Sequence, residues 1–237
     1  MRARAWIPLG LLALAAGYAF LPDLAGRRDP SSARRVPPGR GLVALTFDDG
    51  PDPELTPRVL DVLRAAGATA TFFVVGRRVR RHPELARRAV AEGHALGVHT
   101  ETHRHAWSLG PRALRAEIAN GREAIVAATG RAPLWFRPPW GAFNAATRRA
   151  VRDLGLRTAL WSCDAGDWLP GATAGGIAAR VRRGLADGAV IDLHDGGQTR
   201  AGCRAMVRAL PGILGAAGAA GLRAAHLGVL FDLPPLL

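Results

Sequence analysis

The feature that most constrains the fold of this chain is a regular alternation of short apolar runs with longer helical stretches after residue 40. Turn residues bound the apolar runs, as is typical of buried strands, and proline or glycine marks the ends of several helical stretches. Short connections between such elements predict parallel strands joined by crossover helices. The predicted strands lie at 42–47, 71–75, 96–98, 134–136, 158–161, 189–193 and 227–231, and the predicted helices at 56–67, 83–91, 111–129, 144–154, 177–185 and 204–214.

This pattern predicts an α/β fold with about seven parallel strands. A (β/α) barrel and a doubly wound sheet are both compatible with the alternation. No Gly-x-Gly-x-x-Gly follows the first predicted strand, which disfavours a dinucleotide-binding sheet. The 237 residues, of which 49% are hydrophobic, suffice for one domain with a sizeable core, and we expect a monomer.

The N-terminal residues have the pattern of an export signal. Arg2 and Arg4 precede an uncharged stretch at 5–21, which is at the short end of what spans a bilayer. We predict a signal peptide or membrane anchor in residues 1–25, a basic linker in 26–40 and the folded domain in 41–237. The protein is expected outside the cytoplasm, either secreted or associated with the cytoplasmic membrane through this segment.

The charge of the chain comes from arginine alone: all 32 basic residues are arginine, and the formal net charge is +13. Such a field can draw the protein toward anionic wall polymers or lipid headgroups, and a solvated arginine-rich surface explains it equally well. No nucleic-acid recognition motif accompanies the arginines, so we expect no nucleic-acid partner. Cys163 and Cys203 have no metal-site spacing. A disulfide between them is compatible with a location outside the cytoplasm, but we expect two isolated thiols.

Polar side chains gather where the predicted strands end. In barrel enzymes the carboxyl ends of the strands carry the catalytic groups, so this face predicts an active site. The residues are Asp48 and Asp49 after the first strand, His99 and His103 after the third, Arg137 after the fourth, Asp164 and Asp167 after the fifth, and His194 and Asp195 after the sixth.

Two of these groups have residue types suited to metal chemistry. Histidines four apart can present their imidazoles to one side of a helical turn, and one carboxylate from another strand completes a three-ligand site with an open position. The adjacent Asp48 and Asp49 cannot both be desolvated cheaply without a cation or an arginine partner. One of them can bind metal while the other takes a proton. His194 can protonate a leaving amine, and a structural pair with Asp195 is the alternative.

Five ordered motifs carry a resemblance to a known family. The chain is similar to the polysaccharide deacetylases, carbohydrate esterase family 4, over about residues 41 to 231, and that family has a distorted (β/α) barrel. The motifs are Thr46-Phe47-Asp48-Asp49-Gly50, His99-Thr100-Glu101-Thr102-His103, Arg137-Pro138-Pro139-Trp140-Gly141, Asp164-Ala165-Gly166-Asp167-Trp168 and Leu193-His194-Asp195.

The resemblance implies a role for each motif residue. Asp49, His99 and His103 become ligands of a divalent metal ion, Zn²⁺ in the first place, with Co²⁺, Ni²⁺ or Mn²⁺ as alternatives. Asp48 becomes the general base and His194 the general acid. Arg137 holds Asp48 in its ionised form, and Asp167 or Asp164 orients nearby catalytic groups. Trp140, Trp168 and Leu193 contact the sugar and its acetyl group.

The chain departs from the family pattern at a few positions. Val98 stands where asparagine is common, Arg104 and His105 replace the usual residues after the second histidine, and Asp192 puts an acid into a strand that is usually apolar. These changes concern substrate preference and the surroundings of the site. They leave the implied ligands and the acid–base pair intact.

The resemblance implies a metal-dependent hydrolase that removes N-acetyl groups from an N-acetylglucosamine-containing glycan such as peptidoglycan, an exopolysaccharide or a chito-oligomer. The alternatives are an O-acetyl esterase on xylan-like glycans, a small-amide hydrolase, and a catalytically silent wall-binding module. The intact set of Asp48, Asp49, His99, His103 and His194 argues against the silent module.

The N-terminal pattern generates a prediction about location. Because the basic start and uncharged run direct export, the native full-length chain should be found in the membrane or extracytoplasmic fraction. Fractionation followed by immunodetection measures this. A native chain found entirely in the soluble cytoplasmic fraction would contradict it.

Overall fold

The computed structural model describes residues 32–35, 38–197 and 200–231. The predicted signal peptide or anchor in residues 1–25 lies outside the described residues. Among the helices in the described ranges, none is both long and apolar enough to cross a membrane.

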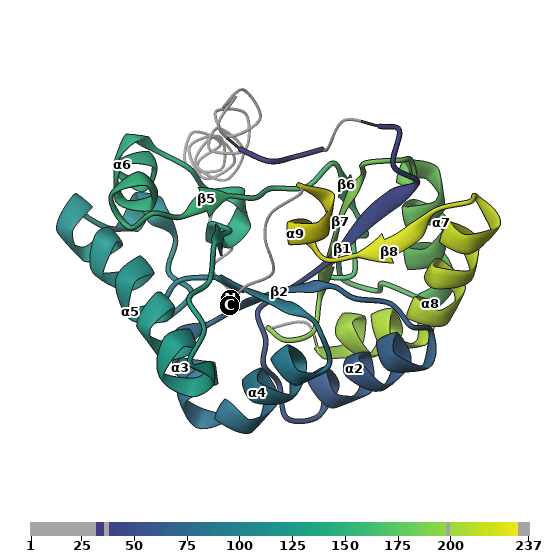
Figure 1. Cartoon of the computed structure of the whole chain (residues 1–237), viewed down its shortest axis with the longest axis horizontal. Helices are drawn as coiled ribbons and strands as arrows, with labels where there is room; N and C mark the ends of the chain where they lie inside the picture. Colours follow the sequence, from purple (N-terminus) through teal and green to yellow (C-terminus); the bar gives the residue numbers. More distant parts are fainter. Residues whose placement is uncertain (1–31, 36–37, 198–199, 232–237) are drawn as a thin grey trace, which may run out of the picture.

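The strands of the described chain form one parallel sheet that curls into a half-barrel (Figure 1). The consecutive strand order, β5-β4-β3-β2-β1-β7-β6 with β8 paired to the start of β1, is that of a barrel. A doubly wound sheet would instead reverse its strand order at a switch point. The strands are β1 (Leu42–Asp48), β2 (Thr71–Val74), β3 (Ala95–Val98), β4 (Trp135–Phe136), β5 (Arg157–Thr158), β6 (Cys163–Asp164), β7 (Val190–His194) and β8 (Arg223–Ala225).

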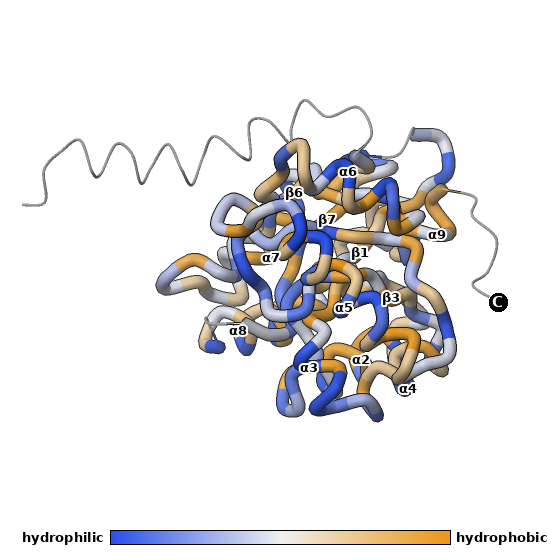
Figure 2. The backbone as a smooth tube through the Cα atoms, turned by 90° about the vertical axis from the view of Figure 1, so that its left-hand side faces the viewer, coloured by the Kyte–Doolittle hydropathy of each residue, from blue (hydrophilic) through white to orange (hydrophobic). Residues whose placement is uncertain are grey.

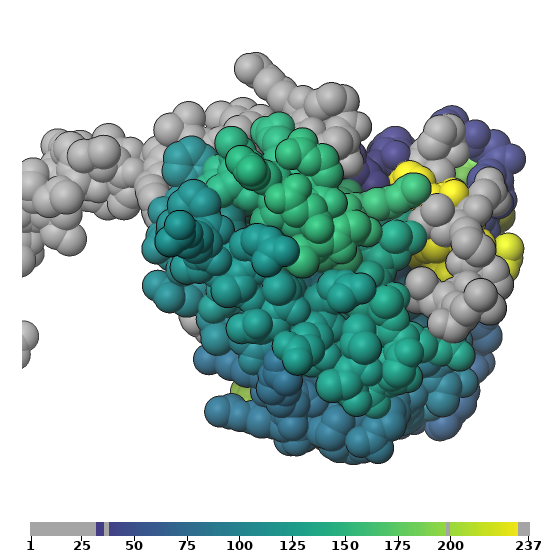
Figure 3. All heavy atoms as spheres, turned by 60° about the vertical axis from the view of Figure 1, so that its left-hand side comes forward, coloured from purple at the N-terminus to yellow at the C-terminus, as the bar shows by residue number. Residues whose placement is uncertain are grey.

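Helices surround the curled sheet, and on the side shown in Figure 3 the middle of the chain forms a continuous surface. Two predicted helices, at 83–91 and 111–129, have the predicted bounds, and both begin with proline at the first helical position. The helices are α2 (Leu55–Ala65), α3 (Gly76–Arg81), α4 (Pro83–Ala91), α5 (Pro111–Thr129), α6 (Ala145–Asp153), α7 (Ala174–Gly184), α8 (Arg200–Ala219) and α9 (Leu227–Leu230), with short 3₁₀ turns η1 (Ala106–Ser108) and η2 (Pro139–Gly141).

The predicted strand at 227–231 is wrong, because this segment contains the helical turn α9. Leu227 and Leu230 are both buried in the apolar cluster inside the sheet, and one helical turn points residues three apart to the same side. The last strand is β8, a few residues earlier, which pairs with Leu42, Val43 and Ala44 of β1.

The predicted strand at 158–161 is also only partly correct. Thr158 belongs to β5, but the chain then crosses directly to β6 on the other edge of the sheet, with no helix between the two strands. The carbonyl oxygens of Ala159 and Leu160 in this connection accept hydrogen bonds from the Arg137 side chain, at 3.3 and 3.1 Å. The side chain of Arg137 therefore satisfies backbone groups that a continued strand would pair with a neighbouring strand.

The alternation of side chains along β1 places two polar residues on the inner face of the sheet. Val43, Leu45 and Phe47 belong to the larger apolar cluster beneath the helices, whereas Leu42 and Ala44 belong to the smaller cluster inside the sheet. Successive side chains of a strand point to opposite faces, so Thr46 and Asp48 follow Leu42 and Ala44 to the inner face.

The neighbouring strand β7 repeats this pattern. Ile191 and Leu193 pack beneath the helices and Val190 packs inside, so Asp192 and His194 also point to the inner face. The register places Asp192 beside Thr46 and His194 beside Asp48. Figure 2 shows hydrophobic and hydrophilic segments following one another along the whole described chain.

The fold predicts that Gly202 in α8 cannot be replaced by a residue with a side chain without a loss of stability. A Cβ atom at this position would overlap the backbone oxygen of Asp167. Gly202→Ala should therefore force α8 away from the Asp167 loop and lower the free energy of unfolding by roughly 1–3 kcal/mol.

Gly215→Ala in the same helix is the matched control, because a Cβ there meets nothing within 4 Å. Alanine favours the helix, so this variant should be more stable by about 0.5–1 kcal/mol. Denaturant unfolding measures both variants. Equal midpoints would contradict the contact.

Candidate active site

The first part of the site is the turn after β1. Asp48 is buried on the inner face, and Asp49 follows it in the left-handed region at φ 73°. The backbone N–H of Asp195 donates to the carbonyl oxygen of Asp48, and that of Val75 donates to the carbonyl oxygen of Gly50. These bonds hold the turn between β7 and β2, so the two adjacent acids point to different places.

The sequence predicted that the two histidines after β3 lie on a helical turn, and this prediction is wrong. They lie in a loop in which Thr100 and His103 have φ values of 64° and 59°. This folded-back loop brings the two imidazole rings to a centroid distance of 5.0 Å. Glu117 of α5 holds it from outside, because its carboxylate accepts from the backbone N–H and the hydroxyl of Thr102, at 2.8 and 2.7 Å.

Asp49, His99 and His103 converge on one point. The Nε2 atoms of His103 and His99 lie 2.9 and 3.5 Å from Oδ1 of Asp49, and this buried oxygen has no hydrogen-bond partner. Nδ1 of His99 lies 2.8 Å from the carbonyl oxygen of Arg137. The Nδ1 atom must carry the proton to donate this bond, so the lone pair of Nε2 faces the carboxylate.

A lone pair facing a carboxylate oxygen is the arrangement that a cation stabilises. One carboxylate and two imidazoles form a donor set typical of a catalytic divalent site, and their ligand atoms lie within 4.8 Å of one another. The residues therefore fit a divalent metal ion.

A second group, Asp48, Asp192 and His194, also has three potential ligand atoms within 4.8 Å. A cation of the protein already lies here, because Nη1 of the fully buried Arg137 is 2.8 Å from Asp48 and 2.7 Å from Asp192. The guanidinium takes the place that a metal ion would need. We therefore assign the metal site to the first group only.

His194 has a buried carboxylate partner. Its Nδ1 atom lies 2.8 Å from Oδ1 of Asp167, and its backbone N–H donates to Oδ2 of Asp167 at 2.7 Å. Burial by itself would lower the pKa of His194, but the charge and hydrogen bond of Asp167 raise it well above the usual value. The contact with Asp167 therefore favours the protonated form of His194 and leaves Nε2 directed away from that partner.

This geometry decides two alternatives that the sequence left open. Asp167 is the partner of His194, whereas Asp164 accepts hydrogen bonds from the backbone of Gly166 and the indole of Trp168. The alternative pairing of His194 with Asp195 is wrong. Asp195 accepts a hydrogen bond from Thr56, and burial raises the pKa of Asp195 to about 7.

Two of the three predicted sugar contacts lie at the surface. Trp140 and Trp168 are 55% and 47% exposed, and the Trp140 ring lies 4.4 Å from that of His103. Leu193 is fully buried in the cluster beneath the helices, so the expectation that it lines the acetyl group does not hold. The alternation along β7 explains this, because Leu193 lies between the inward-pointing Asp192 and His194.

Sequence reasoning missed several residues that shape the site. Arg78 donates to the carbonyl oxygen of Asp49 at 2.6 Å, and Glu117 holds the histidine loop. A charged residue on a helix ordinarily faces solvent, so neither carried a signal. Asp192 did carry one, as an acid inside an apolar strand, but its partner Arg137 lies 55 positions away in the sequence.

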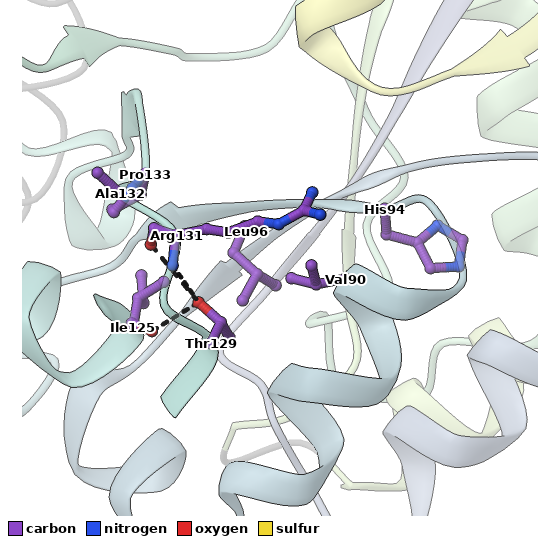
Figure 4. A pocket seen from close by; sticks show the side chains of 8 residues that line it. All are labelled: Val90, His94, Leu96, Ile125, Thr129, Arg131, Ala132 and Pro133. Atoms are coloured by element: carbon purple, nitrogen blue, oxygen red, sulfur yellow. Dashed lines mark hydrogen bonds between the residues drawn. The ribbon is translucent and has the colours of Figure 1, made fainter. Parts of the chain in front are cut away.

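A small cavity lies apart from these groups, between α4, α5 and β3 (Figure 4). His94, which lines it, precedes β3, whereas His99 follows that strand. The cavity is therefore at the opposite end of β3 from the candidate metal ligands. Burial lowers the pKa of His94 to about 4, so this histidine is neutral near pH 7.

Comparison with known proteins identifies relatives of this chain. Residues 35–159 match the model of the family described as polysaccharide deacetylase. The chain is 40% identical over 168 residues to a peptidoglycan-N-acetylglucosamine deacetylase of Bacillus cereus, covering 70% of this chain and 78% of that protein. It is 41% identical over 155 residues to a chitooligosaccharide deacetylase of Rhizobium leguminosarum bv. trifolii, covering 65% and 71%.

Solved structures resemble it over most of its length. The Bc1960 peptidoglycan N-acetylglucosamine deacetylase superposes with a TM-score of 0.81 at 31% identity, covering 87% of this chain and 95% of that chain. BA3943 of Bacillus anthracis, described as a CE4 family pseudoenzyme, superposes with a TM-score of 0.77 at 26% identity, covering 86% and 70%. The fold thus occurs with and without activity, so the side chains of the site must decide the function.

The His194–Asp167 pair generates a prediction about protonation. Asp167→Asn removes the charge that raises the pKa of His194 and leaves the burial that lowers it, so this pKa should fall. Titration of the imidazole by NMR measures the change. Asp164→Asn is the control, since Asp164 bonds to Trp168 and should alter the pKa of His194 much less. Equal shifts in the two variants would contradict the pairing.

Proposed function

We propose that this chain, which belongs to the polysaccharide deacetylase family, is a metal-dependent amidase that removes N-acetyl groups from a polysaccharide containing N-acetylglucosamine. The observation that carries the proposal is the convergence of Asp49, His99 and His103 beside an acid and a base on the inner face of the sheet. The relatives named above are N-deacetylases of peptidoglycan and of chitooligosaccharides. Peptidoglycan is therefore our first choice of substrate.

Asp49, His99 and His103 would hold the metal ion. Two imidazoles and one carboxylate suit Zn²⁺ best, with Co²⁺, Ni²⁺ and Mn²⁺ as alternatives. A bound divalent ion supplies Lewis acidity, which polarises the acetyl carbonyl and acidifies water. The bond from Nδ1 of His99 to the Arg137 carbonyl keeps that ligand in the required tautomer.

Asp48 is suited to act as the general base. Its Oδ1 accepts from Arg137 at 2.8 Å, while its Oδ2 lies 3.8 Å from Nε2 of His99. One oxygen is therefore fixed by the guanidinium, and the other faces the ligand atoms. A carboxylate oxygen in that place can take the proton of the attacking water.

His194 is suited to act as the general acid. Asp167 keeps its imidazole protonated and oriented through Nδ1, so Nε2 can donate to the departing nitrogen. This feature favours an amide over an ester substrate. An amine is a poor leaving group until it is protonated, whereas the alcohol of an ester leaves more easily. O-acetyl ester hydrolysis remains the second candidate.

The proposal also covers the contacts to the sugar rings and the location of the protein. Trp140 and Trp168 would contact the sugar rings beside the site, since both are about half exposed. The glycan substrate lies outside the cytoplasm, in agreement with the export signal predicted for residues 1–25. We propose that the protein acts there as a monomer, either released or held at the membrane.

The proposed roles predict two different mutant phenotypes. His103→Ala or Asp49→Ala removes a ligand and should abolish both metal binding and turnover. Asp48→Asn and His194→Ala should keep the metal ion and lower kcat by roughly 10²–10⁴-fold, because each removes one proton transfer. Metal analysis of the purified proteins and acetate release from peptidoglycan, chito-oligomers and acetylxylan measure both properties.

The substrate panel tests the reaction itself. Release from acetylxylan alone would replace the proposed activity by O-acetyl esterase activity. Wild-type protein that binds metal but releases no acetate from any of the three would refute deacetylation of these glycans. Loss of metal from Asp48→Asn as complete as from Asp49→Ala would overturn the separation of base and ligand.

A further inference from the structure

Asp192 is a buried acid of the inner face to which the proposed function gives no role. It belongs to β7, where the adjacent Ile191 and Leu193 are buried apolar residues. Its own exposure is 3%, and its side chain lies on the same face as those of Asp48 and His194. Burying a carboxyl group is costly unless it has a partner, so its contacts should explain its place there.

The partner of Asp192 is Nη1 of Arg137. This nitrogen has three acceptors, Thr46 Oγ1 at 2.8 Å, Asp48 Oδ1 at 2.8 Å and Asp192 Oδ1 at 2.7 Å. It carries only two protons, so at least one must be shared between acceptors. Asp192 and Asp48 therefore compete for the same donor, and the position of one carboxyl group depends on the other.

The charges in this cluster do not balance if both acids are ionised. Arg137 supplies one positive charge to Asp48 and Asp192 together. The other charged groups that face Asp192 are His194, whose charge is paired with Asp167, and Asp164 on β6, which is a further acid. Two carboxyl groups that share one buried site ordinarily keep one proton between them.

The environment assigns that proton to Asp192. Burial and the neighbouring charge of Asp48 raise the pKa of Asp192 well above its usual value, and Arg137 offsets only part of this effect.

We propose that Asp192 is a positioning residue for the general base: it carries the proton of the pair and, by sharing Nη1 of Arg137, fixes the orientation of Asp48. This inference rests on the proposed function. With Asp192 neutral, Arg137 forms its one ion pair with Asp48. The guanidinium is held by acceptors on both β1 and β7, so Oδ2 of Asp48 stays directed at the ligand atoms.

Infrared spectroscopy of the full-length protein tests the proton without a turnover assay. A protonated carboxylic acid has a carbonyl stretch separate from the carboxylate bands. At about pH 8.5 wild-type protein should show such a band and Asp192→Asn should lack it. That pH exceeds the pKa of about 7 to which burial raises Asp195, so this other buried acid contributes little.

Thr46→Val is the matched control for the spectrum. It removes a neutral acceptor of the same Nη1 atom and should keep the band. A wild-type spectrum identical to that of Asp192→Asn would show that Asp192 is ionised, and this would overturn the proposal.

Turnover of two variants tests the positioning role. Asparagine resembles a neutral aspartic acid in size and can still accept from Arg137, so Asp192→Asn should keep kcat within about threefold of wild type. Asp192→Leu removes an acceptor of Arg137 and should lower kcat roughly tenfold or more with little change in KM or metal content. Equal losses in both variants, or full activity of the leucine variant, would refute the role.

The two tests separate this inference from the proposed function. An inactive wild-type protein would contradict deacetylation, while the infrared comparison would still decide whether Asp192 carries a proton. If Asp192→Leu does not fold, that same comparison with the isosteric asparagine variant remains decisive.

Discussion

The arrangement of the site depends on one buried guanidinium. The side chain of Arg137 contacts acceptors on β1 and β7 and the backbone oxygens of the crossing between β5 and β6, and it lies 4.2 Å from the ring centroid of Phe73 on β2. Its own carbonyl oxygen accepts from His99. A fully buried positive charge must be compensated, and every group that compensates it here is also a part of the active site or of the barrel wall.

The same contacts explain an irregularity of the barrel. A crossover helix between β5 and β6 would be expected from the rest of the chain, but the segment between them crosses directly from one edge of the sheet to the other. The carbonyl oxygens of Ala159 and Leu160 bond to Arg137 instead of to a neighbouring strand. The Arg137 side chain therefore connects β1 and β7 to the β5–β6 segment across the interior of the half-barrel. In a closed barrel, hydrogen bonds between neighbouring strands would make this connection.

The sequence predicted the parts that follow local rules. The apolar run at 42–47 identified the central strand, and proline marked the first residue of α4 and α5. Five motifs identified the chemistry, but not its geometry. The positive φ values at Thr100 and His103, in a loop held by Glu117, and the pairing of Asp192 with Arg137 involve neighbours far along the chain. Leu193 was misplaced because its side was judged from its motif, when the alternation along β7 decides it.

The adjacent acids of the first motif turn to two different partners. Asp49 turns at φ 73° toward the imidazoles of His99 and His103, and Asp48 remains on the strand with one oxygen on Arg137. Had both carboxylates faced the same cation, both would be expected to coordinate it and neither would be free to take a proton. The guanidinium prevents this, because it engages Oδ1 of Asp48 and leaves Oδ2 at 3.8 Å from Nε2 of His99. A carboxylate that is to serve as the proposed base beside the candidate metal site therefore needs a cation of its own, and Arg137, which follows β4, provides one.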